Sequence, residues 1–320
     1  MIIGLSGCAT TLKRHELTYY DYFDTIIEIV YYDNKTDTDE MNKKVEQILK
    51  YWHYYMSNYP GGVIEALNET RKANIPTLIP LFSKVLEWEE KTGYVIDISK
   101  GDLFMLWKNA IDRETLPNEK DIKAALEKGG PESIVLTNES VELKDGADVD
   151  LGAVCKGYLN EELKKFFKDE GIKNYIISAG GNVSVLGKPL EKKKDRFSIG
   201  IESPFEIGAP FDIIYANDKS LVTSGDYQRF AFINEKRYHH IVDLKTGYPA
   251  ENGKRSITIV GDDAFLCDFL STTLFLKSDE EIKEIIKDFP GYEYYIIYAD
   301  GSNYVSEGLK PYVNSLGAKN

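Results

Sequence analysis

The chain has 320 residues, of which 42% are hydrophobic, and a formal net charge of −13, so it can bury one large core or two small ones. The negative charge repels a phosphate backbone, and no run of Lys and Arg with aromatic residues offsets it, so we expect no nucleic-acid partner. No stretch approaches the roughly 18 consecutive apolar residues that span a bilayer.

The N-terminal segment Leu5-Ser6-Gly7-Cys8-Ala9 resembles a bacterial lipobox, in which small residues precede a cysteine that is lipidated on its thiol. We therefore assign residues 1–18 to a lipobox-like segment and tether, including the polar run 10–16, and residues 19–320 to a single domain. A lipid anchor at Cys8 predicts a protein of the bacterial cell envelope, held on the extracytoplasmic face of the inner membrane. The stretch before the cysteine carries no positive charge, so an accidental match also stays open.

Hydrophobic periodicity predicts the elements of the first half. Alternating β-branched residues predict a strand over 25–32, and apolar residues at three- and four-residue spacing predict a helix over 41–56. A second helix is predicted from Thr77, as its N-cap, to Gly93 just beyond its last turn. The other predicted elements are a helix over 117–130, a hairpin of strands 133–136 and 141–143, and a helix over 158–169.

From residue 175 onward the pattern changes to a period of two, which is typical of half-buried strands. The predicted strands are 175–178, 183–186, 197–201, 211–215, 220–223, 229–233, 238–242 and 256–260. Two helices, 263–276 and 279–287, precede a hairpin that turns at Asp300-Gly301. Short strands in succession favour antiparallel pairing, so the predicted fold class is α+β, with a mainly antiparallel sheet core and flanking helices.

Two glycine-containing segments could bring the backbone close to a ligand. The segment 148–158 enters a helix with two carboxylates, two glycines and Lys156, so N–H groups, a carbonyl and an ammonium could converge on an anion. Such a helix entry is more often only a tight turn. The Gly180-Gly181-Asn182 segment serves equally well as a hairpin turn or as a place where a ligand approaches the backbone.

Three later segments are rich in polar groups. Residues 222–229 read Val-Thr-Ser-Gly-Asp-Tyr-Gln-Arg, and residues 239–243 contain two of the chain's four histidines, followed by an aspartate. Asp268, Ser271 and Thr272 lie at i, i+3 and i+4, so on a helix their oxygens share one face. Hard oxygen ligands of this kind suit Mg²⁺, although each residue alone is commonplace in a helix.

In chain order these segments read DxGAxxKGY, AGGN, TSGDYxR, HHIxDxxTGxP and an Asp-x-x-Ser-Thr helix, and together they resemble the ApbE family of FAD:protein FMN transferases. The resemblance runs from about Asp21 to Leu276. Upstream matches are Phe23-Asp24-Thr25, Met56–Tyr59 with Asn68, and Val95–Asp97 followed by Trp107. The resemblance implies that residues 19–320 form a catalytic domain with an ApbE-like, T-fold-like flavin transferase fold.

The resemblance also implies a ligand set. FAD, as the substrate, would be contacted by the positions that match the family's flavin-binding residues: Phe23, Tyr59, Val95, Ile96, Asp97, Asp150, Lys156 and Ile241. Mg²⁺ would be held by the carbonyl of Ala153 and by Asp268 and Thr272, with Ser271 adjacent. A divalent cation would neutralise the pyrophosphate of FAD inside an acidic protein.

The implied reaction moves FMN from FAD to a Thr or Ser hydroxyl of an acceptor protein and releases AMP. The family implies a respiratory-complex subunit or another FMN-binding domain as the acceptor. His240 is our candidate for the base that takes the hydroxyl proton, since an unperturbed histidine titrates near neutrality, and Asp243 is its candidate partner or alternative.

Two other activities fit the same residues. With water as the acceptor, the protein would be a magnesium-dependent FAD pyrophosphatase that gives FMN and AMP. Without catalysis it would be an FAD-binding lipoprotein. Cys155 and Cys267 are expected to be buried small hydrophobic residues without a redox role.

Overall fold

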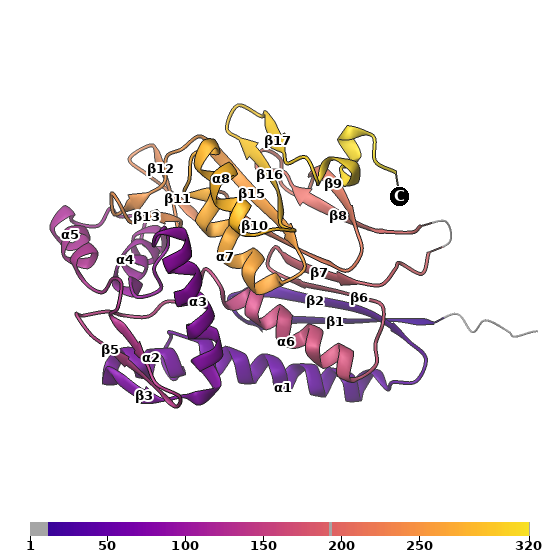
Figure 1. The fold of residues 1–320 in the computed structure, drawn as a ribbon, viewed down its shortest axis with the longest axis horizontal. Coiled ribbons are helices and arrows are strands. Elements are labelled where there is room, and N and C mark those ends of the chain that lie inside the picture. The colour runs from indigo at the N-terminus through magenta and orange to yellow at the C-terminus, as the bar shows by residue number, and fades with distance from the viewer. Residues whose placement is uncertain (1–11, 192–193, 320) are drawn as a thin grey trace, which may run out of the picture.

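The computed structural model describes residues 12–191 and 194–319, and an eight-stranded antiparallel sheet runs through its centre (Figure 1). In spatial order the strands are β1 (Lys13–Tyr22), β2 (Thr25–Asp33), β6 (Tyr175–Ala179), β7 (Asn182–Leu186), β10 (Lys219–Gly225), β15 (Lys254–Gly261), β16 (Glu293–Tyr298) and β17 (Asn303–Val305). The predicted α+β class with an antiparallel core is confirmed.

Three of the α-helices, α1, α6 and α7, pack against this sheet. The helices are α1 (Thr38–Met56), α2 (Val63–Thr70), α3 (Ile79–Thr92), α4 (Gly101–Asp112), α5 (Glu119–Glu127), α6 (Cys155–Asp169), α7 (Ala264–Phe275) and α8 (Asp279–Ile285). Short 3₁₀ turns occupy Pro76–Leu78, Ile286–Asp288, Lys310–Tyr312 and Asn314–Leu316. Within the described residues, no helix is both long enough and apolar enough to cross a membrane.

The two faces of the large sheet are covered by different elements. On one face, Ile177 and Ile259 join the main core beneath the helices. On the other, Leu221 and Val260 pack against the hairpin of β8 (Phe197–Glu202) and β9 (Pro210–Ala216). Successive residues of a strand point to opposite faces, so β15 supplies both cores and is buried almost throughout.

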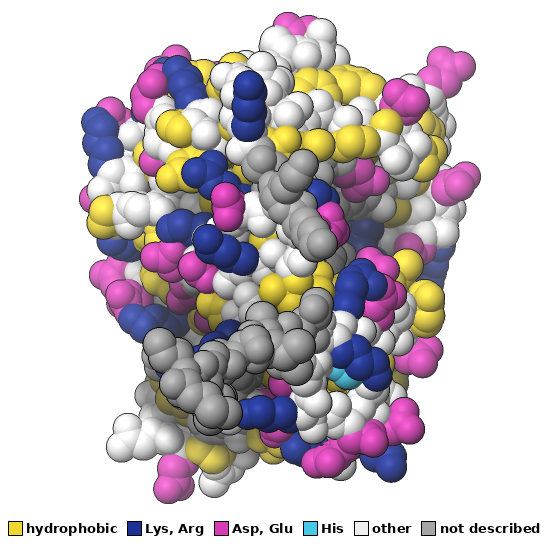
Figure 2. Space-filling view, turned by 90° about the vertical axis from the view of Figure 1, so that its right-hand side faces the viewer, with side chains coloured by type: hydrophobic (Ala, Val, Ile, Leu, Met, Phe, Trp, Pro, Cys, Tyr) yellow, Lys and Arg dark blue, Asp and Glu magenta, His cyan; other side chains and the backbone are white. Residues whose placement is uncertain are grey.

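Smaller sheets complete the fold. They are formed by β3 (Lys72–Asn74), β5 (Ser140–Leu143) and β4 (Ile134–Leu136), by β11 (Phe230–Ile233) and β12 (Lys236–His239), and by β13 (Val242–Asp243) and β14 (Tyr248–Pro249). A third core, which includes Leu103, Trp107 and Val242, joins α4 and α5 to β13. On the side of the molecule seen in Figure 2, basic and acidic side chains are interspersed.

Strand β1 corrects the predicted tether. It pairs with β2 from Lys13 onward, and its Leu17 and His15 are buried. The His15 ring stacks on Tyr31 at 4.6 Å and contacts the hydroxyl of Thr38 at 2.7 Å. The polar run 10–16 is therefore part of the sheet from residue 13, and the folded domain begins before residue 19. Cys8 and the lipobox lie outside the described residues.

Two further predictions differ from the structure. Thr77 does not cap a helix, because it lies inside the 3₁₀ turn that precedes α3, whereas Gly93 ends α3 in the left-handed conformation as predicted. The predicted strand 238–242 is divided, since β12 ends at His239 and β13 begins at Val242. Helices α2 and α4 were not predicted.

Candidate active site

The loop before α6 is fixed by side chains from a distant segment. Asn68 binds both backbone groups of Val149: its Oδ1 accepts the N–H at 2.7 Å and its Nδ2 donates to the carbonyl at 3.0 Å. Asn58 Nδ2 donates to Asp150 Oδ2 at 2.7 Å, and the N–H of Gly152 donates to Asp150 Oδ1 at 2.7 Å. Desolvation raises the pKa of Asp150 above its usual value. The loop therefore presents a partly buried carboxylate in a defined orientation.

A close crossing of α6 and α7 brings Asp268 to the start of α6. The N–H of Gly157 donates to Asp268 Oδ2 at 2.8 Å, and Asp268 is only 3% exposed. A Cβ atom at Gly157 would lie 2.4 Å from the carbonyl oxygen of Ala264 and 2.6 Å from Cβ of Asp268. Glycine is therefore required at this position for steric reasons, because any side chain would push the two helices apart.

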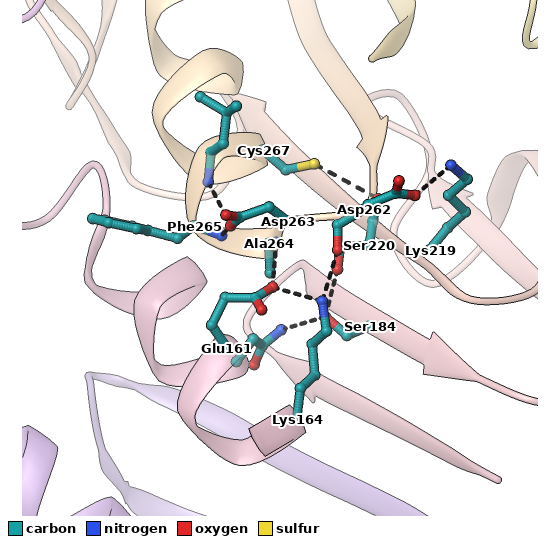
Figure 3. A network of polar contacts seen from close by, with 12 residues as sticks. Glu161, Lys164, Ser184, Lys219, Ser220, Asp262, Asp263, Ala264, Phe265 and Cys267 are labelled. Atoms are coloured by element: carbon teal, nitrogen blue, oxygen red, sulfur yellow. Dashed lines mark hydrogen bonds and ion pairs between the residues drawn. The ribbon is translucent and has the colours of Figure 1, made fainter. Parts of the chain in front are cut away.

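Polar contacts hold the start of α7 against α6 (Figure 3). Glu161 Oε1 accepts the N–H of Ala264 at 2.6 Å and an ammonium hydrogen of Lys164 at 2.6 Å. Lys164 also donates to the carbonyl of Asp262 at 2.7 Å, and Asp263 caps α7 by accepting the N–H groups of Phe265 and Leu266. This network sets the position of Asp268, one turn further along the helix.

The hydroxyls of Ser271 and Thr272 meet a third hydroxyl on β10. Ser224 Oγ lies 2.8 Å from Ser271 Oγ and 3.2 Å from Thr272 Oγ1. Ser271 also donates to the carbonyl of Asp268 at 2.9 Å. The hydroxyls of Ser271, Thr272 and Ser224 thus form one cluster at the contact between α7 and the sheet, about one helical turn beyond Asp268.

The Ala153 carbonyl adds an oxygen at the beginning of α6. In a regular helix it would accept the N–H of Gly157, but that N–H is used by Asp268, and the carbonyl accepts no backbone hydrogen bond within the described residues. The described residues hold no group of three or more His, Cys, Asp or Glu side chains that could bind a metal. A single carboxylate with a carbonyl and hydroxyls fits Mg²⁺, which keeps most of its shell for water or substrate oxygens.

Lys156 and the cysteines flank this group. Burial, the largest effect, would lower the pKa of Lys156, but the charge of Asp268 together with those of neighbouring groups such as Asp150 raises it on balance, so the ammonium stays charged. Desolvation raises the pKa of Cys155 to about 11, and that of Cys267 is raised as well. Cys267 is fully buried and Cys155 partly so, and both are in the thiol form that lacks nucleophilic character.

Phe23 lies in the turn between β1 and β2, and Tyr59 contacts the next residue of that turn. Phe23 and Asp24 both adopt the left-handed conformation, with φ of 56° and 52°. The Tyr59 hydroxyl donates to Asp24 Oδ2 at 2.6 Å, and Lys108 Nζ lies 4.0 Å from the centre of the Tyr59 ring. Both candidate aromatic residues remain partly exposed, and the turn is held by contacts from α4.

Residues 95–97 are oriented differently from one another. Ile96 is buried in the main core, so only its backbone could meet a ligand. Val95 lines a hollow of about 220 Å³, together with Asp243. Asp97 accepts the N–H of Ser99 at 2.8 Å and lines a second hollow, of about 330 Å³, beside the buried Glu89. Burial, and then the charge of Asp97, raise the pKa of Glu89 well above its usual value.

The ring of His240 contacts a backbone carbonyl. Its Nδ1 lies 3.2 Å from the carbonyl of Arg229, and a carbonyl only accepts, so Nδ1 carries the hydrogen and Nε2 is left with its lone pair. His240 retains exposed surface, yet the protein around it lowers its pKa by desolvation, and the charges of Arg229 and Lys156 act in the same direction. The neighbouring Ile241 is buried.

Asp243 does not contact His240 through any hydrogen bond within the described residues. Its Oδ1 accepts the N–H of Lys245 at 2.9 Å, in the turn between β13 and β14. The structure therefore gives no support to Asp243 as the partner of His240, and the Arg229 carbonyl fills that position. Asn58, Asn68 and Ser224 lie in segments that the sequence marks as informative, but no role is predicted for any of them from the sequence alone.

The sequence matches the ApbE family over residues 23–296. It is similar to the FAD:protein FMN transferase of Treponema pallidum, with 27% identity over 264 residues that cover 76% of this chain and 71% of that protein. The enzyme of the same name from Haemophilus influenzae is 27% identical over 318 residues, covering 94% of this chain and 91% of the other. The crystal structure of the ApbE protein from Thermotoga maritima superposes with a TM-score of 0.83 at 27% identity, covering 94% of this chain and 99% of that chain.

Proposed function

The chain belongs to the ApbE family, and from that premise we propose that the residues around the α6–α7 crossing bind FAD and transfer its FMN half to a protein hydroxyl. The enzyme is an FAD:protein FMN transferase, with FAD as its substrate and a flavoprotein as the acceptor. One observation supports the assignment to this site: the buried carboxylate of Asp268 accepts the N–H of Gly157 at the start of α6.

Mg²⁺ would be held by Asp268, Thr272 and the Ala153 carbonyl, with Ser271 adjacent. When bound, the ion would neutralise the negative charge of the pyrophosphate of FAD. The unused backbone carbonyl of Ala153 supports this set, as does the grouping of hydroxyls around Ser224. Only one carboxylate is needed, because the substrate brings its own anionic oxygens.

The chain's own residues orient FAD and move one proton. Lys156 would pair its ammonium with a phosphate, and Asp150 would accept hydrogen bonds from the substrate while Asn58 holds it. Phe23 and Tyr59 would offer aromatic surface to a planar ring, and residues 95–97 and Ile241 would line its surroundings.

In the transfer itself, the acceptor oxygen forms a bond to the FMN phosphorus as the bond from that phosphorus to the AMP oxygen breaks. Nε2 of His240 would take the proton that the acceptor hydroxyl loses. The acceptor would be a Thr or Ser of a respiratory-complex subunit or another FMN-binding domain. A lipid anchor at Cys8 would hold the enzyme beside such acceptors at the outer face of the cell membrane.

The first test replaces the proposed metal carboxylate. We expect Asp268→Asn to lower FMN transfer by about two orders of magnitude or more, because the charge stabilisation that a metal supplies is worth several kcal/mol. The protein is incubated with FAD, Mg²⁺ and a recombinant FMN-accepting domain. Flavin fluorescence that survives a denaturing gel is measured together with AMP release. Asp262→Asn is the matched control, since that carboxylate lies nearby but at the surface, where it pairs with Lys219.

The same assay separates the alternative activities. Covalent flavin on the acceptor demonstrates transfer, whereas free FMN and AMP without labelled acceptor would identify a pyrophosphatase. Bound FAD with neither product would identify a non-catalytic binder. If Asp268→Asn keeps the wild-type rate, the metal assignment is wrong.

A further inference from the structure

The turn between β1 and β2 holds two residues in an unusual backbone conformation. Tyr22 pairs with Thr25 across the hairpin, so only two residues form the turn. They are Phe23 and Asp24, whose φ angles are 56° and 52°. Positive φ at both central residues is typical of tight hairpin turns in which Gly takes the second position. Asp24 therefore stands where Gly would fit with less strain, which points to a use for its side chain.

The carboxylate of Asp24 contacts two side chains from other parts of the chain. Its Oδ2 accepts the hydroxyl hydrogen of Tyr59 at 2.6 Å and lies 3.8 Å from Nζ of Lys108 on α4. The same Nζ lies 4.0 Å from the centre of the Tyr59 ring. Each of the three groups thus contacts the other two. Because Lys108 covers one face of the ring, a planar ligand can stack only on the other face.

The backbone of this turn is held by two further segments. The N–H of Phe23 donates to Nδ1 of His53 on α1 at 3.2 Å, and the two rings meet edge to face. Nη2 of Arg229 donates to the carbonyl of Asp24 at 3.4 Å. Residues with unfavourable backbone angles persist where their surroundings fix them, and such positions are common at ligand sites. The contacts come from segments far apart in the chain, so the turn has one defined orientation.

Two cationic partners of the turn also act on the loop before α6. Desolvation raises the pKa of Asp150, while the positive charges of Lys108 and Arg229 lower it, so both cations lie near that carboxylate. Asp150 belongs to the proposed FAD site. The turn that orients the Tyr59 ring is therefore part of the surroundings of that site.

We infer that Asp24 is a positioning residue for FAD: its carboxylate fixes the Tyr59 ring, with Lys108 on one face, so that the other face receives a planar ring of the substrate. The inference rests on the proposed function, because it takes FAD as the ligand. An aromatic ring that is oriented before binding loses little freedom when the substrate arrives, which favours affinity. Gly at this position would relax the turn but leave the Tyr59 ring free to rotate.

The test measures FAD affinity and stability in the same variants. For Asp24→Gly, we expect the Kd for FAD, measured by flavin fluorescence, to rise about fivefold or more, because a hydrogen bond to a charged group is lost. The midpoint of urea unfolding should stay level or rise, since Gly adopts positive φ without strain. Asp24→Asn should keep the Kd within about twofold, because its amide oxygen still accepts from Tyr59 and Asn tolerates this conformation.

Glu235→Gly is the matched control. Asn234 and Glu235 form the two-residue turn between β11 and β12, and the exposed Glu235 has a φ of 64° at the second position of that turn. The control should therefore match Asp24→Gly in its unfolding midpoint and the wild type in its affinity for FAD.

Other results would contradict the inference. Wild-type affinity in Asp24→Gly would show that Asp24 does not position the ring, and an equal loss in Asp24→Asn would attribute the effect to charge alone. A lower unfolding midpoint for Asp24→Gly than for Glu235→Gly would make the residue structural. If the wild type binds FAD but transfers no FMN, the proposed function fails while the role of Asp24 in binding is retained. If the wild type binds no FAD, both are wrong.

Discussion

His240 donates its Nδ1 hydrogen to the Arg229 carbonyl, so Nε2 is the atom available for proton transfer. Its surroundings lower its pKa, which keeps the ring neutral through the physiological range. The ring is thus protonated, and lost as a base, only at a pH below the one at which an ordinary histidine is protonated.

We therefore expect the wild-type kcat/KM to be level between about pH 6 and pH 8 and to fall only below the usual histidine range. His240→Ala should lower transfer by about 100-fold or more, as is typical for loss of a general base. The variant should also lose the fall in kcat/KM at acidic pH. The measurement is a pH–rate profile for both proteins with saturating FAD. Near-normal transfer by the variant across this range would exclude His240 as the base.

At the same scale, the sequence could propose Asp268 and Thr272 as metal ligands but could not predict which side chains they contact. Helical spacing places Asp268, Ser271 and Thr272 on one face, and the structure agrees. Ser224 comes from a strand 47 residues away from Ser271, and no local pattern predicts such a contact. Asp243 follows His240 closely in sequence, but its carboxylate accepts the N–H of Lys245 in the turn that follows β13.

At the scale of elements, the α6–α7 crossing depends on the absence of a side chain at Gly157. We expect Gly157→Ala to lower the free energy of unfolding by about 1–3 kcal/mol, the usual cost of overpacking, and to lower transfer as Asp268 is displaced. The midpoint of urea unfolding measures the first effect. Gly200→Ala is a fair comparison, because its added Cβ would meet only Pro210 at an ordinary 3.5 Å. Equal midpoints for the two variants would show that the crossing adapts.

Hydrophobic periodicity predicts some of the helices and strands but not others. The α1 helix has buried residues Met41, Val45 and Leu49 at helical spacing, so its prediction succeeded. In α4, Leu103, Trp107 and Ala110 are buried at the same helical spacing, so this helix too could be predicted from periodicity. Strand β1 is not predicted from the sequence, because charged and polar residues fill its exposed positions and it has no apolar run. It is held in the sheet by its pairing with β2.

At the scale of the whole molecule, β1 forms one edge of the large sheet and belongs to the folded domain. A chain that begins at residue 19 should be less stable than one that begins at residue 12, by about 2 kcal/mol or more, since the burial of Leu17 alone is worth that amount. It would also lose the contacts of His15 with Thr38 and Tyr31. Chemical denaturation of the two truncated proteins gives the difference. Indistinguishable curves would restore the interpretation of this segment as a tether.

The contacts that build the site join residues far apart in the chain: Asn58 to Asp150 across 92 residues, and Gly157 to Asp268 across 111. A ribosome adds about 5–20 residues per second, so α7 follows α6 by roughly 5–20 s. During that interval the nascent chain already has Lys156 and the loop at Asp150 but lacks Asp268 and the hydroxyls beside it. The nascent chain therefore cannot form its proposed metal site before α7 is synthesised, even when flavin is present.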